Sequence, residues 1–227
     1  MTSNQRFLKV AAVCAFLTAI TTLAIHLLPN LWSDYRSFEA QIELRRHSIY
    51  LTRLWIVIVH CLLVIISMYA VRTLAPIASS ALPNLGFLAF VVFAYTELLR
   101  TSLVIFAVNR TWRASYASAS DPATLDRDRA FIEGFVGINA ALFFLFFTAF
   151  LLGTICYGLS FYRATGLDKR IGLLFLLWAA LSIPTLIDTL AGATFVSTYF
   201  EWVGPYFQPL ARVLIGIWLW RSTVPRA

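Results

Sequence analysis

Six long apolar segments constrain the fold of this chain more than any other feature of its sequence. Each has about 20 mainly apolar residues, the length that an α-helix needs to cross a bilayer. Open strands would leave backbone groups unpaired in lipid, and a barrel would require alternating apolar and polar residues. The sequence therefore predicts an all-α, polytopic bundle of six transmembrane helices, forming one domain over residues 1–227. The segments run roughly from Phe7 to Leu28, Leu51 to Leu74, Leu85 to Val108, Phe131 to Leu159, Ile171 to Ala191 and Trp202 to Trp220.

Composition and charge narrow the classes of function. The chain is 60% hydrophobic and 13% charged, and its mean hydropathy is +0.78, whereas a soluble protein carries about 25% charged residues. The net charge is +7, but no run of Lys and Arg exceeds two residues. That pattern argues against a nucleic-acid partner and leaves membrane lipids as the expected surroundings.

Motifs for metal, cofactor or nucleophile chemistry are missing from the sequence. Cys14, Cys61 and Cys156 lie inside apolar segments and have neither metal-ligand nor disulfide spacing. No HExxH, GxSxG, CxxC or P-loop pattern occurs. We therefore expect no metal and no cofactor, name no catalytic residue, and favour a non-enzymatic protein while leaving enzymatic activity open.

The stretch between the first two apolar segments, Leu31 to Tyr50, has helical periodicity. Its apolar residues recur at spacings of three, four and seven, and charged residues occupy the other faces. This pattern predicts an amphipathic helix on the membrane surface, either shielding the bundle or acting as a lid over a cavity. The apolar residues are Leu31, Tyr35, Phe38, Ile42 and Ile49.

Two further local patterns concern the fourth apolar segment. Asn109 to Arg129 is polar and predicts a loop, with a helix start at Ser120-Asp121-Pro122. Small residues three and four apart predict a close approach of a neighbouring helix within the chain. These residues are Gly134, Gly137 and Ala141.

The distribution of basic residues sets the expected orientation. With the N-terminus inside, eight basic residues lie on the cytoplasmic side and seven on the outer side. The short loop Phe161 to Arg170 carries three of them close to the membrane, which favours cytoplasmic N- and C-termini.

Ionisable residues inside the apolar segments are the candidate functional residues, because charge within a membrane is costly. Glu97 and Arg100 are three residues apart, so they share a helix face and can pair. Arg212 lies near the middle of the sixth segment, and Asp188 follows Pro184 on one face of the fifth. The predicted intramembrane polar cluster is Glu97, Arg100, Glu133, Asn139, Asp188 and Arg212.

Two interpretations of this cluster remain open. The residues can be interhelical ion pairs and hydrogen bonds that hold the bundle together. They can instead line a water-filled cavity that binds an anionic or zwitterionic headgroup or solute through Arg100 and Arg212. Arg53 and Glu133, near helix ends, can also snorkel to the interface.

The layout from the fourth segment onward resembles an uncharacterised family of bacterial six-helix membrane proteins, known as a domain of unknown function. The resemblance rests on the stretch Phe150 to Gly158, on Tyr162-Arg163 and on Gly166 to Gly172, where a helix exits to a short basic turn and re-enters. Glu97 and Arg100 are similar to that family's polar third helix. The resemblance implies a bacterial inner-membrane protein and assigns no activity.

Three classes of function follow. The first is a non-enzymatic membrane protein with a structural, regulatory or ligand-binding role. The second is a small transporter or solute-binding channel that uses the intramembrane Glu/Arg/Asp cluster. The third is an enzyme acting on lipid headgroups, which ranks last because no nucleophile–base pair can be named.

Overall fold

The computed structural model describes residues 2–28, 37–76, 81–191 and 195–223, with only the backbone at residues 189, 191 and 195–204. The described residues form helices and contain no strand. The helices are α1 (Ser3–Leu27), α2 (Phe38–Arg46), α3 (Ser48–Thr73), α4 (Ala81–Leu103), the π-helix η3 (Val104–Arg113), α5 (Ala114–Ser118), α6 (Pro122–Phe161), α7 (Gly166–Ala191) and α8 (Phe195–Arg221). The predicted all-α fold is confirmed.

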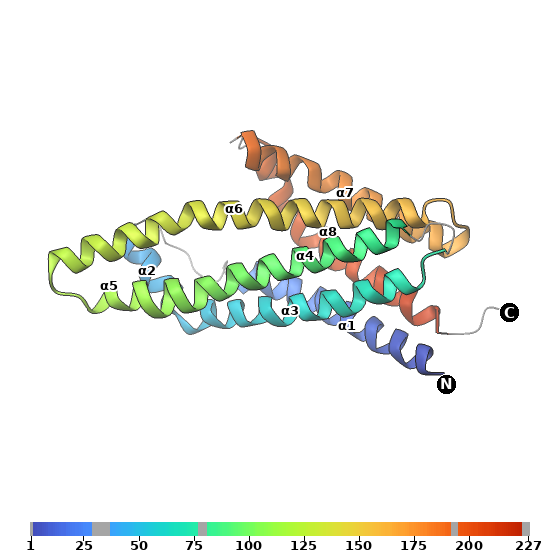
Figure 1. Cartoon of the computed structure of the whole chain (residues 1–227), viewed down its shortest axis with the longest axis horizontal. Helices are drawn as coiled ribbons and strands as arrows, with labels where there is room; N and C mark the ends of the chain where they lie inside the picture. The colour runs from blue at the N-terminus through green and yellow to red at the C-terminus, as the bar shows by residue number, and fades with distance from the viewer. Residues whose placement is uncertain (1, 29–36, 77–80, 192–194, 224–227) are drawn as a thin grey trace.

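Six long helices form a closed ring in chain order. Each of α1, α3, α4, α6, α7 and α8 packs against the next, and α8 packs against α1 (Figure 1). The first turn of α1 and the last turn of α8 lie at the same end of the bundle (Figure 1). This arrangement leaves one interior, which all six helices border.

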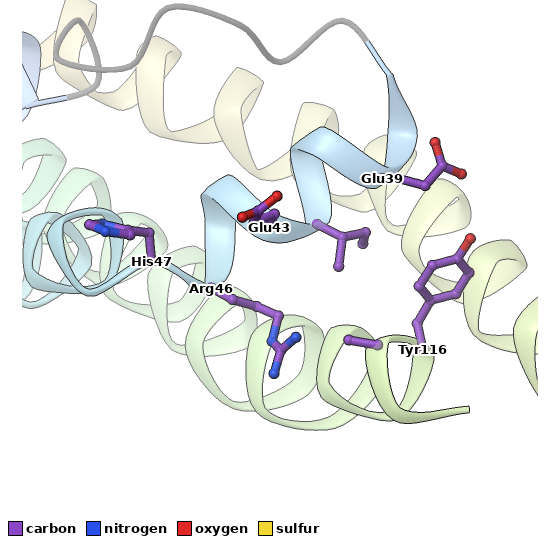
Figure 2. A pocket seen from close by; sticks show the side chains of 7 residues that line it. Glu39, Glu43, Arg46, His47 and Tyr116 are labelled. Atoms are coloured by element: carbon purple, nitrogen blue, oxygen red, sulfur yellow. The ribbon is translucent and has the colours of Figure 1, made fainter. Parts of the chain in front are cut away.

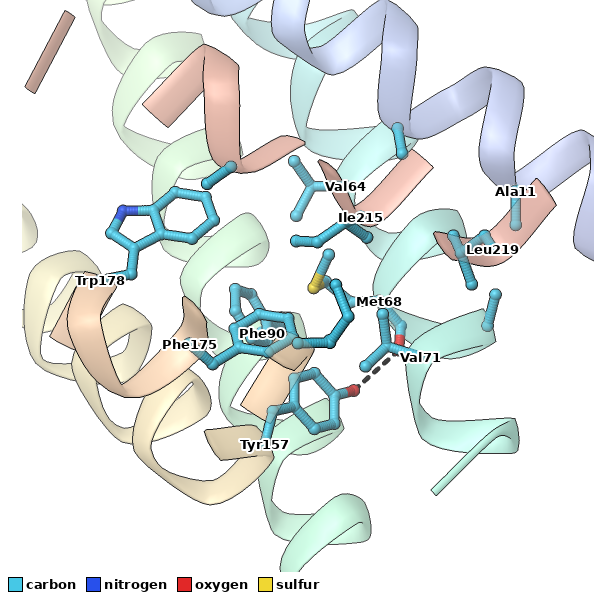
Figure 3. Close-up of a cluster of buried hydrophobic side chains, with 14 of the residues drawn as sticks. Ala11, Val64, Met68, Val71, Phe90, Tyr157, Phe175, Trp178, Ile215 and Leu219 are labelled. Carbon is cyan, nitrogen blue, oxygen red and sulfur yellow. Dashed lines mark hydrogen bonds between the residues drawn. The ribbon is translucent and has the colours of Figure 1, made fainter. Parts of the chain in front are cut away.

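Large side chains fill the ring at the end where α1 begins (Figure 3). Phe90 stacks on Tyr157 with ring centroids 5.5 Å apart, and the Tyr157 hydroxyl donates to the Met68 carbonyl oxygen at 2.7 Å. Trp178 lies farther along the same interior and is 2% exposed. Tyrosine satisfies its buried hydroxyl in this way because a buried polar group without a partner is costly.

Apolar side chains also cover the outside of the ring. Ile20, Leu88 and Val136, on three different helices, are each more than half exposed. Exposing apolar side chains along whole helices is unfavourable in water but not in lipid. Among the described residues, five helical segments are long and apolar enough to cross a membrane, which is consistent with an integral membrane protein. They are Ser3–Leu27, Ser48–Thr73, Ala81–Ser118, Pro122–Phe161 and Gly166–Asp188.

The predicted loop from Asn109 to Arg129 is wrong. Helix α4 continues without a break through η3 and α5, and only residues 119–121 link it to α6. The segment contains no helix breaker before Ser120, and its alanines favour helix. The polarity of this segment is explained by the length of the helical hairpin. Helix α6 has 40 residues and is about 60 Å long, twice the thickness of the hydrocarbon layer, so part of this helical hairpin must extend into water.

The predicted helix start at Asp121 is confirmed. Its carboxylate accepts a hydrogen bond from the Thr124 amide at 2.9 Å, and Pro122 is the first helical residue. These are the side-chain N-cap and N1 proline that begin many helices. The hydrogen bond from Thr124 holds the pKa of Asp121 below its ordinary value.

The close helix approach predicted at Gly134 and Gly137 is also wrong. A Cβ atom added at either position would meet nothing within 4 Å. Other glycines bring helices together instead. At Gly172 an added Cβ would lie 2.8 Å from backbone atoms of Phe161 and Tyr162, at the crossing of α7 and α6.

The predicted surface helix corresponds in part to α2, which packs against α3 and η3. Its residue Ile42 is buried, and Phe38 contacts Tyr116 of α5 edge-to-face at 5.2 Å. Leu31 and Tyr35 lie outside the described residues. The structure therefore shows which helices α2 covers, and its position on a membrane surface stays a prediction.

Candidate functional site

Glu97 and Arg100 form an ion pair inside the bundle, as their spacing predicts. The guanidinium donates from Nε to Glu97 Oε2 at 2.7 Å and from Nη2 to Oε1 at 2.5 Å. Its third nitrogen, Nη1, donates to Asn139 Oδ1 of α6 at 3.2 Å. The Glu97 side chain is 8% exposed and that of Arg100 is 26% exposed. Two helices thus join at this paired and hydrogen-bonded group.

Arg212 of α8 has a different environment. It is 3% exposed, and its guanidinium lies over the Trp178 ring of α7, 5.1 Å from the centroid. Its Nε and Nη1 atoms have no hydrogen-bond partner among the described residues. The ring face attracts the cation but satisfies none of its donors. Unlike Arg100, Arg212 therefore has donors that the described residues leave unsatisfied.

No described carboxylate lies where it could neutralise Arg212. Glu97 already binds Arg100 through both oxygens. Asp188 follows Trp178 by ten residues on α7, which is about 15 Å along the helix axis. Among the described residues, no acid thus lies within reach of Arg212.

The other predicted cluster residues lie apart from this group. Glu133 pairs with Arg129 at 2.8 Å on an exposed face of α6. Both carboxylate oxygens of Asp188 are buried without a partner among the described residues. The expected single cluster is therefore divided into the Glu97–Arg100–Asn139 group, the Arg212 site, the Arg129–Glu133 pair and Asp188.

Three residues that were not among the predicted cluster residues lie near Arg212. Trp178 supplies the aromatic face, and Cys61 and His60 of α3 lie close enough for electrostatic interaction with the guanidinium. His60 Nδ1 lies 2.8 Å from Thr21 Oγ1 of α1, which links a fourth helix to the site. Their only sequence signal is polarity near the middle of an apolar segment, and that signal does not show which helices touch.

A chain of electrostatic neighbours connects Arg212 with the far end of the bundle. Arg113 and Arg100 both lie near Tyr50, and Arg100 and Arg212 both lie near Cys61. Arg53 lies beside Arg100 and Glu97, and its Nε donates to the Ile25 carbonyl oxygen at 2.9 Å. These arginines form a column, and Glu97 is the one acid among the neighbours that connect them. The members of the column are Arg113, Arg53, Arg100 and Arg212.

Comparisons of the chain with protein-family models, with curated proteins and with solved structures found no match. Among the described residues, no group of three His, Cys, Asp or Glu side chains could hold a metal ion. The chemistry of the site must therefore be argued from its own residues, which are predominantly hydrogen-bond donors and cations.

Proposed function

We propose that this chain is a non-enzymatic, ligand-binding protein of the bacterial inner membrane that binds an anionic or zwitterionic ligand inside its helix bundle. The observation that carries the proposal is Arg212, a buried arginine with two unpartnered nitrogens and no described acid in reach. An anionic group at this position would satisfy those donors.

Energetics favour a ligand over a permanently dry arginine. Removing the partner of a buried ion costs about 3–5 kcal/mol, because the remaining charge is left uncompensated. An intramembrane charge is also costly by itself, and such residues mark binding sites and pathways. The contact with Trp178 offsets only about 2 kcal/mol. An anion, or water that accompanies it, supplies the hydrogen-bond acceptors and the negative charge that the described side chains do not.

Six membrane crossings and cytoplasmic termini complete the proposal. Helix α8 has 27 residues, enough for about 40 Å, and it packs between α7 and α1 in the ring. The beginning of α1 and the end of α8 lie together (Figure 1), as an even number of crossings requires. Arg163, Lys169 and Arg170 lie at or beside the α6–α7 link, and basic residues favour the cytoplasmic side.

A transporter is the second candidate. The column from Arg113 to Arg212 favours it, because successive cations offer an anion a stepwise route from one end of the bundle to its interior. Helix α2, amphipathic and next to η3, then lies on the membrane surface near the start of this route. No metal-ligand set among the described residues supports the lipid-headgroup enzyme.

A thermal-shift screen tests the binding proposal. The purified protein is heated with phosphate, sulfate, short carboxylates or glycerol phosphate, since a ligand that binds only the folded state raises the Tm. We expect at least one anion to raise the Tm of the wild-type protein and of Arg129→Gln, a surface control. The rise should disappear in Arg212→Met, which keeps a long side chain without the charge.

Two results would count against the proposal. An absence of stabilisation by every anion would leave Arg212 without a ligand. An equal response in Arg212→Met and the wild type would place the anion elsewhere on the protein.

A further inference from the structure

A pocket outside the Arg212 site lies between α2 and α5. Its volume is about 380 Å³, and charged residues of α2 face Tyr116 and Ala117 of α5 across it. Figure 2 shows Glu39 and Tyr116 at one end of the pocket, and Arg46 and His47 toward the other. A space of this size suits a small-molecule ligand.

Two buried donors lie on the same helical segment, Arg113 one turn and Asn109 about two turns before Tyr116 and Ala117. Asn109 and Arg113, both on η3, are 5% and 3% exposed. Arg113 Nη1 donates to Asn109 Oδ1. Arg113 Nε and Asn109 Nδ2 have no hydrogen-bond partner among the described residues. Because both free groups are donors, they require an acceptor.

The π-helix brings these residues toward the pocket. Tyr116 and Ala117 follow Arg113 by three and four residues, so all three share one helix face. Arg45 of α2 lies close enough to Arg113 for electrostatic repulsion, and its neighbour Arg46 lines the pocket. π-Helical segments are rare and occur frequently at functional sites.

The charges of the pocket are separated along α2. Its basic end, with Arg45 and Arg46, lies next to the unpartnered donors of η3. Its acidic end carries Glu39 and Glu43, which are four residues apart and so share a face. A simple phosphate would be attracted by the arginines and repelled by the two carboxylates. A zwitterion with a phosphate at one end and an ammonium at the other fits both ends.

We infer that the α2–α5 pocket binds a phosphoammonium zwitterion. Its phosphate pairs with Arg46, which lines the pocket, and is attracted by the charge of Arg113 one helical turn away, and its ammonium pairs with Glu39 or Glu43. Arginine and amide donors are the groups that recognise phosphate oxygens. The same chemistry is present in a phosphoethanolamine lipid headgroup and in soluble phosphoethanolamine. This site is separate from Arg212, so it stands whether or not the bundle interior binds a ligand.

Binding measurements with both probes test the inference. The purified protein in neutral detergent is titrated with soluble phosphoethanolamine and, separately, with a short-chain phosphatidylethanolamine, and binding is followed by native mass spectrometry. We expect one or both to bind the wild-type protein, and Arg113→Gln to weaken that binding at least tenfold. Binding of the lipid alone identifies a headgroup site, and binding of the soluble probe identifies a solute site.

Charge variants make the test specific. Glu43→Gln should weaken binding of the amine-bearing probe and leave a short-chain phosphatidylglycerol unaffected or bound more tightly. Arg46→Gln, at an exposed position, should weaken both lipids and serves if Arg113→Gln fails to fold. Asp126→Asn, at an exposed position of α6, is the matched control and should bind as the wild type does. Failure of both probes to bind the wild type, or unchanged affinity in Arg113→Gln and Arg46→Gln, would overturn the inference.

Discussion

The crossing of α6 and α7 allows a prediction whose magnitude comes directly from the geometry. In Gly172→Ala, the new Cβ would lie 2.8 Å from the Phe161 carbonyl carbon and 2.8 Å from the Tyr162 nitrogen. Both are backbone atoms, so no side-chain rotation relieves the overlap. The two helices must move apart at this crossing, where the side chain of Phe161 is fully buried.

The expected loss of stability follows from two opposing effects. Forcing an extra carbon into a packed interior costs about 1–3 kcal/mol, and replacing glycine by alanine inside a helix gains about 1 kcal/mol. The net expectation is a destabilisation of roughly 1–2 kcal/mol, since rigid backbone favours the upper part of the overpacking range. Gly137→Ala is the matched control. Its Cβ meets open space, so only the gain of up to about 1 kcal/mol remains.

A native cysteine provides the assay. Cys14 is 7% exposed, so with Cys61 and Cys156 replaced, a thiol-reactive dye reports unfolding as Cys14 becomes accessible. The midpoint in detergent should fall for Gly172→Ala and stay or rise for Gly137→Ala. An equal fall of the unfolding midpoint in both variants would refute the reasoning. It would show that an added Cβ costs as much in open space as at the crowded helix crossing.

Three further predictions concern hydrogen bonds of the bundle and of its hairpin. Tyr157→Phe removes a buried hydrogen bond to a backbone carbonyl of α3 and should cost about 1 kcal/mol in the same dye assay; an unchanged midpoint would contradict that bond. Glu97→Gln leaves Arg100 without its carboxylate and should cost about 1–2 kcal/mol, and a stabilised variant would contradict the buried ion pair. The stabilisation of α6 by its N-cap should depend on pH. The pKa of Asp121 is lowered in the folded state. The stabilisation that the Asp121 carboxylate contributes is therefore present above its unfolded pKa of about 3.9 and is lost as pH falls through its folded pKa. Protection of the Thr124 amide from hydrogen exchange should decline over that range in the wild type and not in Asp121→Asn; identical profiles would contradict the cap.

Local spacing predicted the parts of the structure that depend on one helix. The Glu97–Arg100 pair follows from a separation of three residues, and the Asp121 cap follows from the order Ser-Asp-Pro. The apolar segments predicted an all-helical membrane protein because lipid leaves the backbone few alternatives. These features require no knowledge of which helices touch.

Features that depend on contacts between helices were missed or misplaced. The polar stretch after Val108 was interpreted as a loop because its polarity resembles one, although a helix that extends into water has the same composition. Gly137 has the spacing of a packing residue, but no neighbouring helix lies beside it. The environment of Arg212 depends on the register of α8 against Trp178 and Cys61, which the sequence of any single helix does not contain.

The central claim, that Arg212 makes the bundle interior a site for anions, can be tested most directly at Cys61. With Cys14 and Cys156 replaced, this cysteine is exposed to an anionic and to a cationic methanethiosulfonate reagent. Each rate is normalised to that of a cysteine placed at the exposed residue Ser120. The account predicts that Cys61 reacts faster with the anionic reagent, and that Arg212→Met abolishes this preference. Equal normalised rates in the wild type, or a preference for the anionic reagent that persists in Arg212→Met, would contradict the claim.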